Sequence, residues 1–215
     1  MSESGAEKPS EEPREDLGER IGTRFDLIDT YLRITRSTSI LRRYFVMNAF
    51  DGAMTSLGVV IGSYVANIDD PRDVIGLILV SGVAMAVSGF TGTYMTESAE
   101  RLKSLNDLED AMLSDMRATD FGKASHFVAL IAALVDGAAP FLASIPCILP
   151  FALSLLGVLS IHPAFYVSIA GTLSVLFFLG FYLGRLSERN VIFSGIKMVL
   201  AGSLVALIAL LLGGE

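Results

Sequence analysis

Two acidic residues inside long apolar stretches are the side chains best suited to chemistry in this chain. Asp51 lies early in the first apolar stretch, and Asp136 lies in the first half of a later one. A carboxylate in hydrocarbon is costly, so it normally faces a cavity, a partner or a transport pathway. We therefore expect Asp51 to be functional. For Asp136 two roles stay open: a proton carrier, or an acceptor for backbone donors that are freed near a kink at Pro140.

Helical spacing surrounds Asp51 with further donor atoms. Met47 and Met54 fall on the same stripe of a helix as Asp51, and Asn48 lies beside it. A carboxylate oxygen, an amide oxygen and two thioethers suit a borderline transition metal such as iron(II) better than magnesium or calcium. The alternative for both methionines is ordinary helix contact within the membrane.

Residues 97–123 form an acidic linker with seven carboxylates. Glu97, at the predicted membrane boundary, is the strongest candidate ligand among them. Three further acids would concentrate cations at a pore mouth: Glu100, Glu109 and Asp110. The alternative is the solvated face of a cytoplasmic helix, in which Glu97 and Arg101 stand at ion-pair spacing.

The hydropathy of the chain predicts the elements that position these residues. Of the 215 residues, 52% are hydrophobic, and the mean hydropathy is +0.58. Residues 1–43 are polar, whereas residues 44–215 consist largely of apolar runs, so we predict an all-α integral membrane protein with five transmembrane helices. The expected spans are about Tyr44–Ala66, Val74–Thr96, a third that begins near His126, Ala164–Gly184 and Val191–Gly213. The clear spans exceed the roughly 20 residues that cross a hydrocarbon core.

The third segment, residues 126–160, is long for one crossing and short for two. It also contains Pro140, Pro146 and Pro150. The distribution of lysine and arginine favours one bent crossing, because it places fifteen of the sixteen basic residues on one side, with only Arg72 opposite. The positive-inside rule then predicts a cytoplasmic N-terminus and an external C-terminus.

The N-terminal arm divides into two parts. Residues 1–16 hold six acids and two prolines, which predicts a disordered acidic tail. Apolar residues recur every three or four positions in residues 17–36, so we predict that 17–43 form an amphipathic cytoplasmic or interfacial helix. It would lie on the membrane surface or against the protein's own cytoplasmic loops. No apolar signal-peptide core precedes the first span.

Several function classes find no support in the residues. The formal net charge is −7, and no basic patch with interleaved aromatics indicates nucleic-acid binding. No histidine-rich metal motif, phosphate loop or nucleophile–base pair is visible, so we expect neither an enzyme nor a permanently bound cofactor. The lone Cys147 is expected to be a small buried residue.

The ordered motifs of the spans resemble the vacuolar iron transporter family, over roughly residues 42–214. The resemblance is carried by Asp51-Gly52-Ala53-Met54-Thr55-Ser56-Leu57-Gly58 with Gly62, by Ser81-Gly82-Val83-Ala84 and Ser88-Gly89 followed by Glu97, by Gly137-Ala138-Ala139-Pro140 with Pro146, and by Ser194-Gly195-Ile196-Lys197-Met198 with Gly202.

The resemblance implies proton-coupled export of manganese(II) or iron(II) from the cytosol by a homodimer. The pathway would lie between the first and second spans of the two subunits. The family's first-span aspartate corresponds to Asp51, and its second-span glutamate corresponds to Glu97. The membrane would be the plasma membrane in a prokaryote or a vacuole-type membrane in a eukaryote.

Two departures from the family keep other functions open. The family's Ser-Met pair falls at Gly92-Thr93, so the second-span thioether is missing, and Met54 is the candidate to replace it. The linker is also shorter than the glutamate-lined cytoplasmic domain of iron-transporting relatives. The alternatives are a transporter of a different solute on the same scaffold, and a membrane anchor or assembly protein that works through its N-terminal arm.

Overall fold

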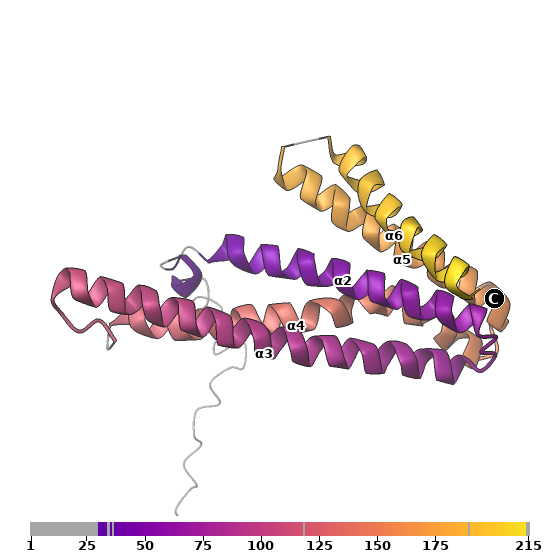
Figure 1. Ribbon diagram of the computed structural model, residues 1–215, viewed down its shortest axis with the longest axis horizontal. Helices are drawn as coiled ribbons and strands as arrows, with labels where there is room; N and C mark the ends of the chain where they lie inside the picture. Colours follow the sequence, from indigo (N-terminus) through magenta and orange to yellow (C-terminus); the bar gives the residue numbers. More distant parts are fainter. Residues whose placement is uncertain (1–29, 34, 36, 118, 189, 214–215) are drawn as a thin grey trace, which may run out of the picture.

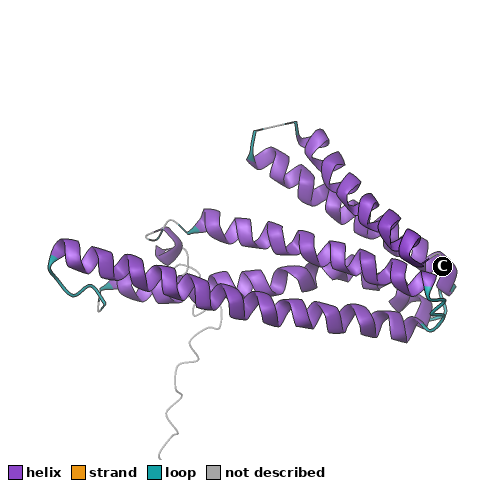
Figure 2. Cartoon of the chain, in the orientation of Figure 1, coloured by secondary structure: helices purple, strands orange, loops and turns teal. Residues whose placement is uncertain are grey.

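Long apolar runs fold into long helices here, and helices are the only regular elements in the described part of the chain (Figure 2). The computed structural model describes residues 30–33, 35, 37–117, 119–188 and 190–213. Five helices follow one another: α2 (Thr38–Val65), α3 (Pro71–Met112), α4 (Asp120–Leu155), α5 (Ile161–Leu186) and α6 (Val191–Gly213) (Figure 1). Each is long and apolar enough to cross a membrane, which confirms the five predicted spans.

Three boundaries differ clearly from those expected from hydropathy, and one of them is the start of α4, at Asp120 rather than near His126. The first span begins at Thr38, because the helix continues backwards through the basic pair Arg42 and Arg43. The second span and the acidic linker form one helix of 42 residues, α3. At 1.5 Å per residue α3 is roughly 63 Å long, about twice the thickness of a hydrocarbon core. The predicted acidic tail and residues 17–29 of the predicted amphipathic helix lie outside the described residues.

Local capping explains where α3 and α4 start. The Asp70 carboxylate accepts a hydrogen bond from the backbone N–H of Arg72 at 2.8 Å, and Pro71 occupies the first helical position, where no N–H is needed. At the start of α4 the Thr119 hydroxyl accepts from the N–H of Gly122 at 3.3 Å. Both caps satisfy donors that the helix cannot satisfy itself.

Helix α4 is one continuous helix with three prolines inside it, as the single-crossing interpretation predicts. Proline lacks an N–H and disturbs the preceding turn, so carbonyls in that turn lose donors. Pro150 leaves the carbonyl of Pro146 without its helical donor, and the next carbonyl, that of Cys147, accepts a hydrogen bond at 2.7 Å from the Ser168 hydroxyl of α5. Polar contacts from a neighbouring helix near a proline make it tolerable in a membrane helix. The predicted burial of Cys147 is confirmed.

Helices α2 and α4 form the centre of the bundle, because α2 contacts the other four helices and α4 contacts α2, α3 and α5. Glycines permit two close approaches to α4. A β-carbon at Gly52 of α2 would lie 2.7 Å from the carbonyl oxygen of Pro140, and one at Gly137 would lie 2.7 Å from the carbonyl oxygen of Ala86 on α3. Membrane helices gain little hydrophobic free energy by leaving lipid for one another. Close packing of small residues therefore contributes much of the free energy of helix association.

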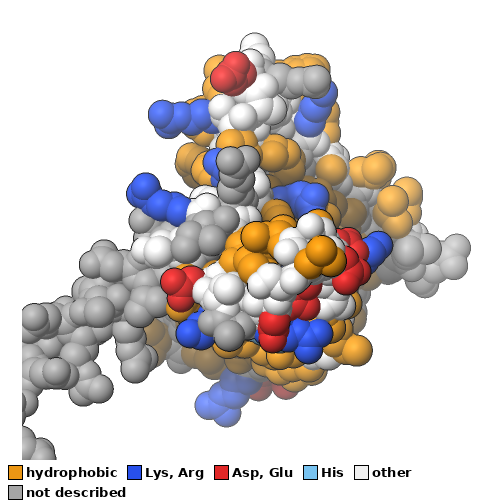
Figure 3. Space-filling model, turned by 90° about the vertical axis from the view of Figure 1, so that its left-hand side faces the viewer, with side chains coloured by type: hydrophobic (Ala, Val, Ile, Leu, Met, Phe, Trp, Pro, Cys, Tyr) orange, Lys and Arg blue, Asp and Glu red, His pale blue; other side chains and the backbone are white. Residues whose placement is uncertain are grey.

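Charged side chains gather at one end of the molecule. In Figure 1 the α3–α4 loop lies at the far left and the start of α2 lies to the right of it, whereas the α5–α6 turn stands at the top, near the middle of the view. Seen from the left, the surface carries lysines, arginines and acids (Figure 3). All three segments lie away from the end that carries the α2–α3 and α4–α5 loops, and their assignment to the cytoplasm stays a prediction.

The contact of Gly52 with Pro140 generates a test of the α2–α4 interface. Gly52→Ala should lower the free energy of unfolding by about 1–3 kcal/mol, because the new methyl group overlaps backbone atoms that have no room to move. The midpoint of thermal unfolding in detergent measures the effect. The matched control is Gly76→Ala on α3, where a β-carbon meets nothing within 4 Å. Equal midpoints for the two variants would contradict this account of the interface.

Candidate functional site

The carboxylate of Asp136 is the best-satisfied polar group inside the bundle. Asp136 is only 3% exposed. The Asn48 amide of α2 donates to its Oδ1, and the Thr93 hydroxyl of α3 donates to its Oδ2 at 2.6 Å. Gly89 of α3 leaves room for it, because a β-carbon there would lie 3.1 Å from Oδ2. The donors are thus side chains of two other helices rather than backbone groups freed by Pro140.

Asn48 keeps one hydrogen-bonding atom available. Its Nδ2 donates to Asp136 and, at 3.3 Å, to the carbonyl of Tyr44. Its amide oxygen receives no donor from the residues that the structure describes, although a carboxamide oxygen can accept two. An oxygen atom next to a buried carboxylate is a reasonable ligand for a hard or borderline cation.

A second polar contact joins α2 to α3 at Glu97. Glu97 is only 4% exposed. The Tyr44 hydroxyl donates to its Oε1 at 2.9 Å, and the Arg101 guanidinium pairs with its Oε2 at 3.1 Å. Arg101 also donates to the hydroxyl of Ser37 at 2.9 Å. The predicted ion pair of Glu97 with Arg101 is therefore confirmed, and it occupies one oxygen of the candidate ligand.

These contacts form a column along α2. Tyr44, Asn48 and Asp51 follow one another by one helical turn, so they share a face of the helix. Tyr44 meets Glu97, Asn48 meets Asp136, and Asp51 follows Asn48 by three positions on the same helix. We call these five residues, Tyr44, Asn48, Asp51, Glu97 and Asp136, the polar column. It leads from the charged end of the molecule into the apolar bundle.

The outer face of α2 is uncovered in a single chain. Asp51 is exposed, and the side chain of Met47 one turn away is 56% exposed. A β-carbon at Gly58 or at Gly62 would meet nothing within 4 Å. Met54 is partly buried and packs against the apolar cluster that α2 forms with α4 and α5. Of the two candidate thioethers, Met47 is therefore the one that shares the open face with Asp51.

The linker acids have mixed surroundings. Glu100 and Asp110 are exposed on α3. Glu109 holds the α3–α4 loop, because its Oε1 accepts from the backbone N–H of Met116 at 2.9 Å and its Oε2 lies 3.6 Å from Arg117. In the same loop the backbone N–H of Arg117 lowers the pKa of Asp115 below its ordinary value. Glu109 thus has a structural role that its sequence position did not indicate.

Sequence reasoning missed two members of this network, Tyr44 and Thr93, as partners of the acids. Both stand one turn from a polar residue on their own helix, since Tyr44 precedes Asn48 and Thr93 precedes Glu97 by four positions. Polar residues that repeat every four positions in an apolar helix could have indicated that Tyr44 and Thr93 belong to the same polar face as the acids.

One chain does not assemble a complete metal site from the usual ligands. Within the described ranges, no three side chains of His, Cys, Asp or Glu come together as a metal would require. Glu97 is paired, Asp136 is buried, and Asp51 faces outwards. A cation bound at Asp51 would complete its coordination with amide oxygen, thioether, water or a second subunit.

The chain was compared with known proteins. A family model described as the VIT family matches residues 96–214, from the end of the second span through α6. An uncharacterized protein of Methanocaldococcus jannaschii is 31% identical over 173 residues, which cover 79% of this chain and 87% of that protein. No solved structure matches the chain significantly. The five membrane-length helices and the match over more than half of the sequence lead to one conclusion: the chain belongs to the VIT family, a family of multi-pass membrane transporters of metal ions.

Proposed function

We propose that this protein carries manganese(II) or iron(II) out of the cytosol in exchange for protons. The polar column supports the proposal, because α2 brings two buried carboxylates, Glu97 and Asp136, beside the helix face that also carries Asp51. Ionisable residues at this depth normally mark ion or proton pathways.

In this proposal the metal first loses water near Glu97, where the linker acids Glu100 and Asp110 raise its local concentration. The Arg101 guanidinium must leave Oε2 of Glu97 before a cation can bind there, since both occupy the same lone pairs. The metal then passes to Asp51, with help from the Asn48 amide oxygen and the thioethers of Met47 and Met54.

Proton coupling follows from the chemistry of carboxylates. A proton and a metal ion compete for the same oxygen lone pairs, so protonation of Asp51 from the far side would release the metal. Asp136, which is buried beside Asn48 of the column, would serve as the second proton carrier.

A homodimer would complete the site. The open face of α2 carries Met47, Asp51, Gly58 and Gly62, and the two glycines allow another helix to approach closely. A second copy placed there would bring two Asp51 carboxylates to one pathway. The proposed membrane is the plasma membrane in a prokaryote or a vacuole-type membrane in a eukaryote.

Metal uptake into proteoliposomes tests the proposal. With an acidic interior, wild type should accumulate manganese(II) or iron(II), and Asp51→Asn should reduce the initial rate at least tenfold, because the amide cannot exchange a proton for a metal. Uptake of the radioactive metal ion gives the rate. The matched control, Asp69→Asn, removes the same charge from an exposed position in the α2–α3 loop and should transport normally. Failure of folded wild type to take up either metal would instead favour a different solute.

The position of Arg101 generates a second prediction. Arg101→Gln should lower the manganese(II) concentration that gives half-maximal uptake several-fold, because a neutral amide no longer competes with the metal for Glu97. Uptake rates over a range of metal concentrations measure the change. Lys103→Gln removes one positive charge from an exposed position on the same helix and serves as the control. The half-maximal concentration of Arg101→Gln could instead equal or exceed that of wild type while Lys103→Gln behaves like wild type. That result would show that Glu97 is not where the metal binds.

A further inference from the structure

Ser37, the residue before α2, uses its hydroxyl in an unusual way. A serine at the N-cap of a helix normally accepts a hydrogen bond from a backbone N–H of the first turn. Ser37 occupies the N-cap position of α2, yet its side chain caps no backbone N–H. It is completely buried, and its Oγ accepts from the Arg101 guanidinium at 2.9 Å instead. The hydroxyl therefore binds a side chain of α3 rather than its own helix.

The hydroxyl of Ser37 also belongs to a chain of hydrogen bonds. It donates to Oγ1 of Thr35 at 2.8 Å, and Thr35 donates in turn to the carbonyl of Tyr31 at 2.7 Å. Each hydroxyl thus accepts on one side and donates on the other, an arrangement in which successive hydrogen bonds strengthen one another. The backbone N–H of Ser37 donates to the carbonyl of Leu32 at 3.1 Å. The position of the Ser37 hydroxyl is therefore fixed by the chain segment before α2.

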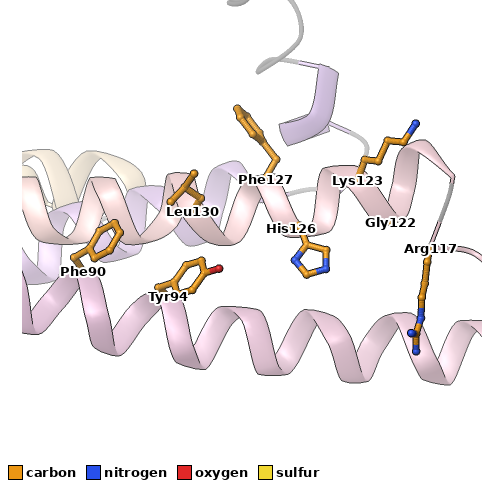
Figure 4. A pocket seen from close by; sticks show the side chains of 8 residues that line it. All are labelled: Phe90, Tyr94, Arg117, Gly122, Lys123, His126, Phe127 and Leu130. Carbon is orange, nitrogen blue, oxygen red and sulfur yellow. The ribbon is translucent and has the colours of Figure 1, made fainter.

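This segment is itself anchored to α4. The rings of Tyr31 and Phe127 meet edge to face, with 5.5 Å between their centroids. Figure 4 shows Phe127 on the side of α4 that faces away from α3, where the short helical piece of residues 30–33 lies. The neighbouring His126 points the other way, into the space between α3 and α4. Tyr31 and Ser37 therefore tie the segment before α2 to α4 and to α3, respectively.

Arg101 stands between this segment and Glu97. Its Nη2 donates to Ser37, and its Nε pairs with Oε2 of Glu97 at 3.1 Å. An ion pair at this spacing on one helix usually contributes little, because both side chains lose rotamer freedom when they are held together. Here Ser37 lowers that cost, since a second fixed contact already restricts the guanidinium to the orientation that faces Glu97. The other carboxylate oxygen of Glu97 accepts from Tyr44, so both oxygens are occupied.

We propose that Ser37 is a positioning residue, which holds the Arg101 guanidinium on Glu97 and so sets how readily Glu97 accepts a cation. The segment before α2 thereby stabilises the closed form of this carboxylate. The effect on the metal rests on the proposed function, in which Glu97 receives the metal. The positioning of Arg101 does not rest on it, because it follows from contacts within the protein alone.

Chemical labelling with phenylglyoxal, which modifies arginine, tests the positioning without any metal. The full-length protein in detergent is treated with the reagent, and mass spectrometry of its peptides gives the labelling rate at Arg101. Ser37→Ala should raise that rate several-fold, because the guanidinium loses one of its two contacts. The variant should fold normally, since the Ser37 side chain makes no cap bond.

The matched control for the labelling is Ser39→Ala. It removes a hydroxyl from an exposed position two residues further along and should leave the labelling rate at Arg101 unchanged. Equal labelling rates at Arg101 in wild type and Ser37→Ala would overturn the proposal.

Manganese(II) uptake into proteoliposomes tests the consequence for the cation. Ser37→Ala should lower the half-maximal concentration about twofold, with an unchanged maximal rate. Added to Arg101→Gln, the same change should have no further effect, because Ser37 acts only through the guanidinium. A residue with a purely structural role would change both backgrounds alike.

The two measurements separate this inference from the proposed function. If Arg101→Gln lowers the half-maximal concentration and Ser37→Ala does not, Ser37 does not position Arg101, and the inference is wrong while the proposed function stands. If neither variant lowers it but Ser37→Ala still raises the labelling of Arg101, the positioning is confirmed. Metal binding at Glu97 is then wrong, and the proposed control of the cation is overturned with it.

Discussion

The cost of placing a carboxylate in an apolar bundle constrains much of this structure. Asp136 is almost completely buried, and its two oxygens take donors from Asn48 on α2 and Thr93 on α3. A buried charge without such donors would cost several kcal/mol, so the three helices are held in the one register that supplies them. The glycine contacts serve the same register, because Gly52 and Gly137 bring α2 and α3 close to α4 on either side of Asp136.

The same constraint orders the rest of the polar column. Each acid that enters the bundle meets a polar residue of α2, and only Asp51 is left on an open face. The carboxylates of the column thus differ in whether other side chains already occupy their oxygens, and the proposed exchange uses that difference. The acids that are tied to donors also hold the helices in register, whereas Asp51 is already open to exchange a proton for a metal. The open glycine face of α2 around Asp51 is the surface where a second subunit would enclose that exchange.

The fold was largely predictable, because hydropathy and the placement of basic residues depend on the membrane rather than on detailed contacts. The five membrane-length helices and the continuity of α4 follow from these patterns. The continuity of α3 with the linker could not be predicted from hydropathy. A change from apolar to acidic residues marks the membrane boundary, and a helix can continue beyond that boundary. The acids of the site were predictable as costly residues. Their partners Tyr44 and Thr93 were not, because helix-to-helix register cannot be read from a single sequence.

Metal-driven proton movement is the most direct test of the central claim, that carboxylates of the column exchange a metal for protons. Proteoliposomes with a trapped pH-sensitive dye and equal pH on both sides would be given external manganese(II) or iron(II). The account predicts that the interior becomes alkaline as metal enters wild-type vesicles, and that it stays at its starting pH with Asp51→Asn. Entry of metal into wild-type vesicles without any change of internal pH would contradict it.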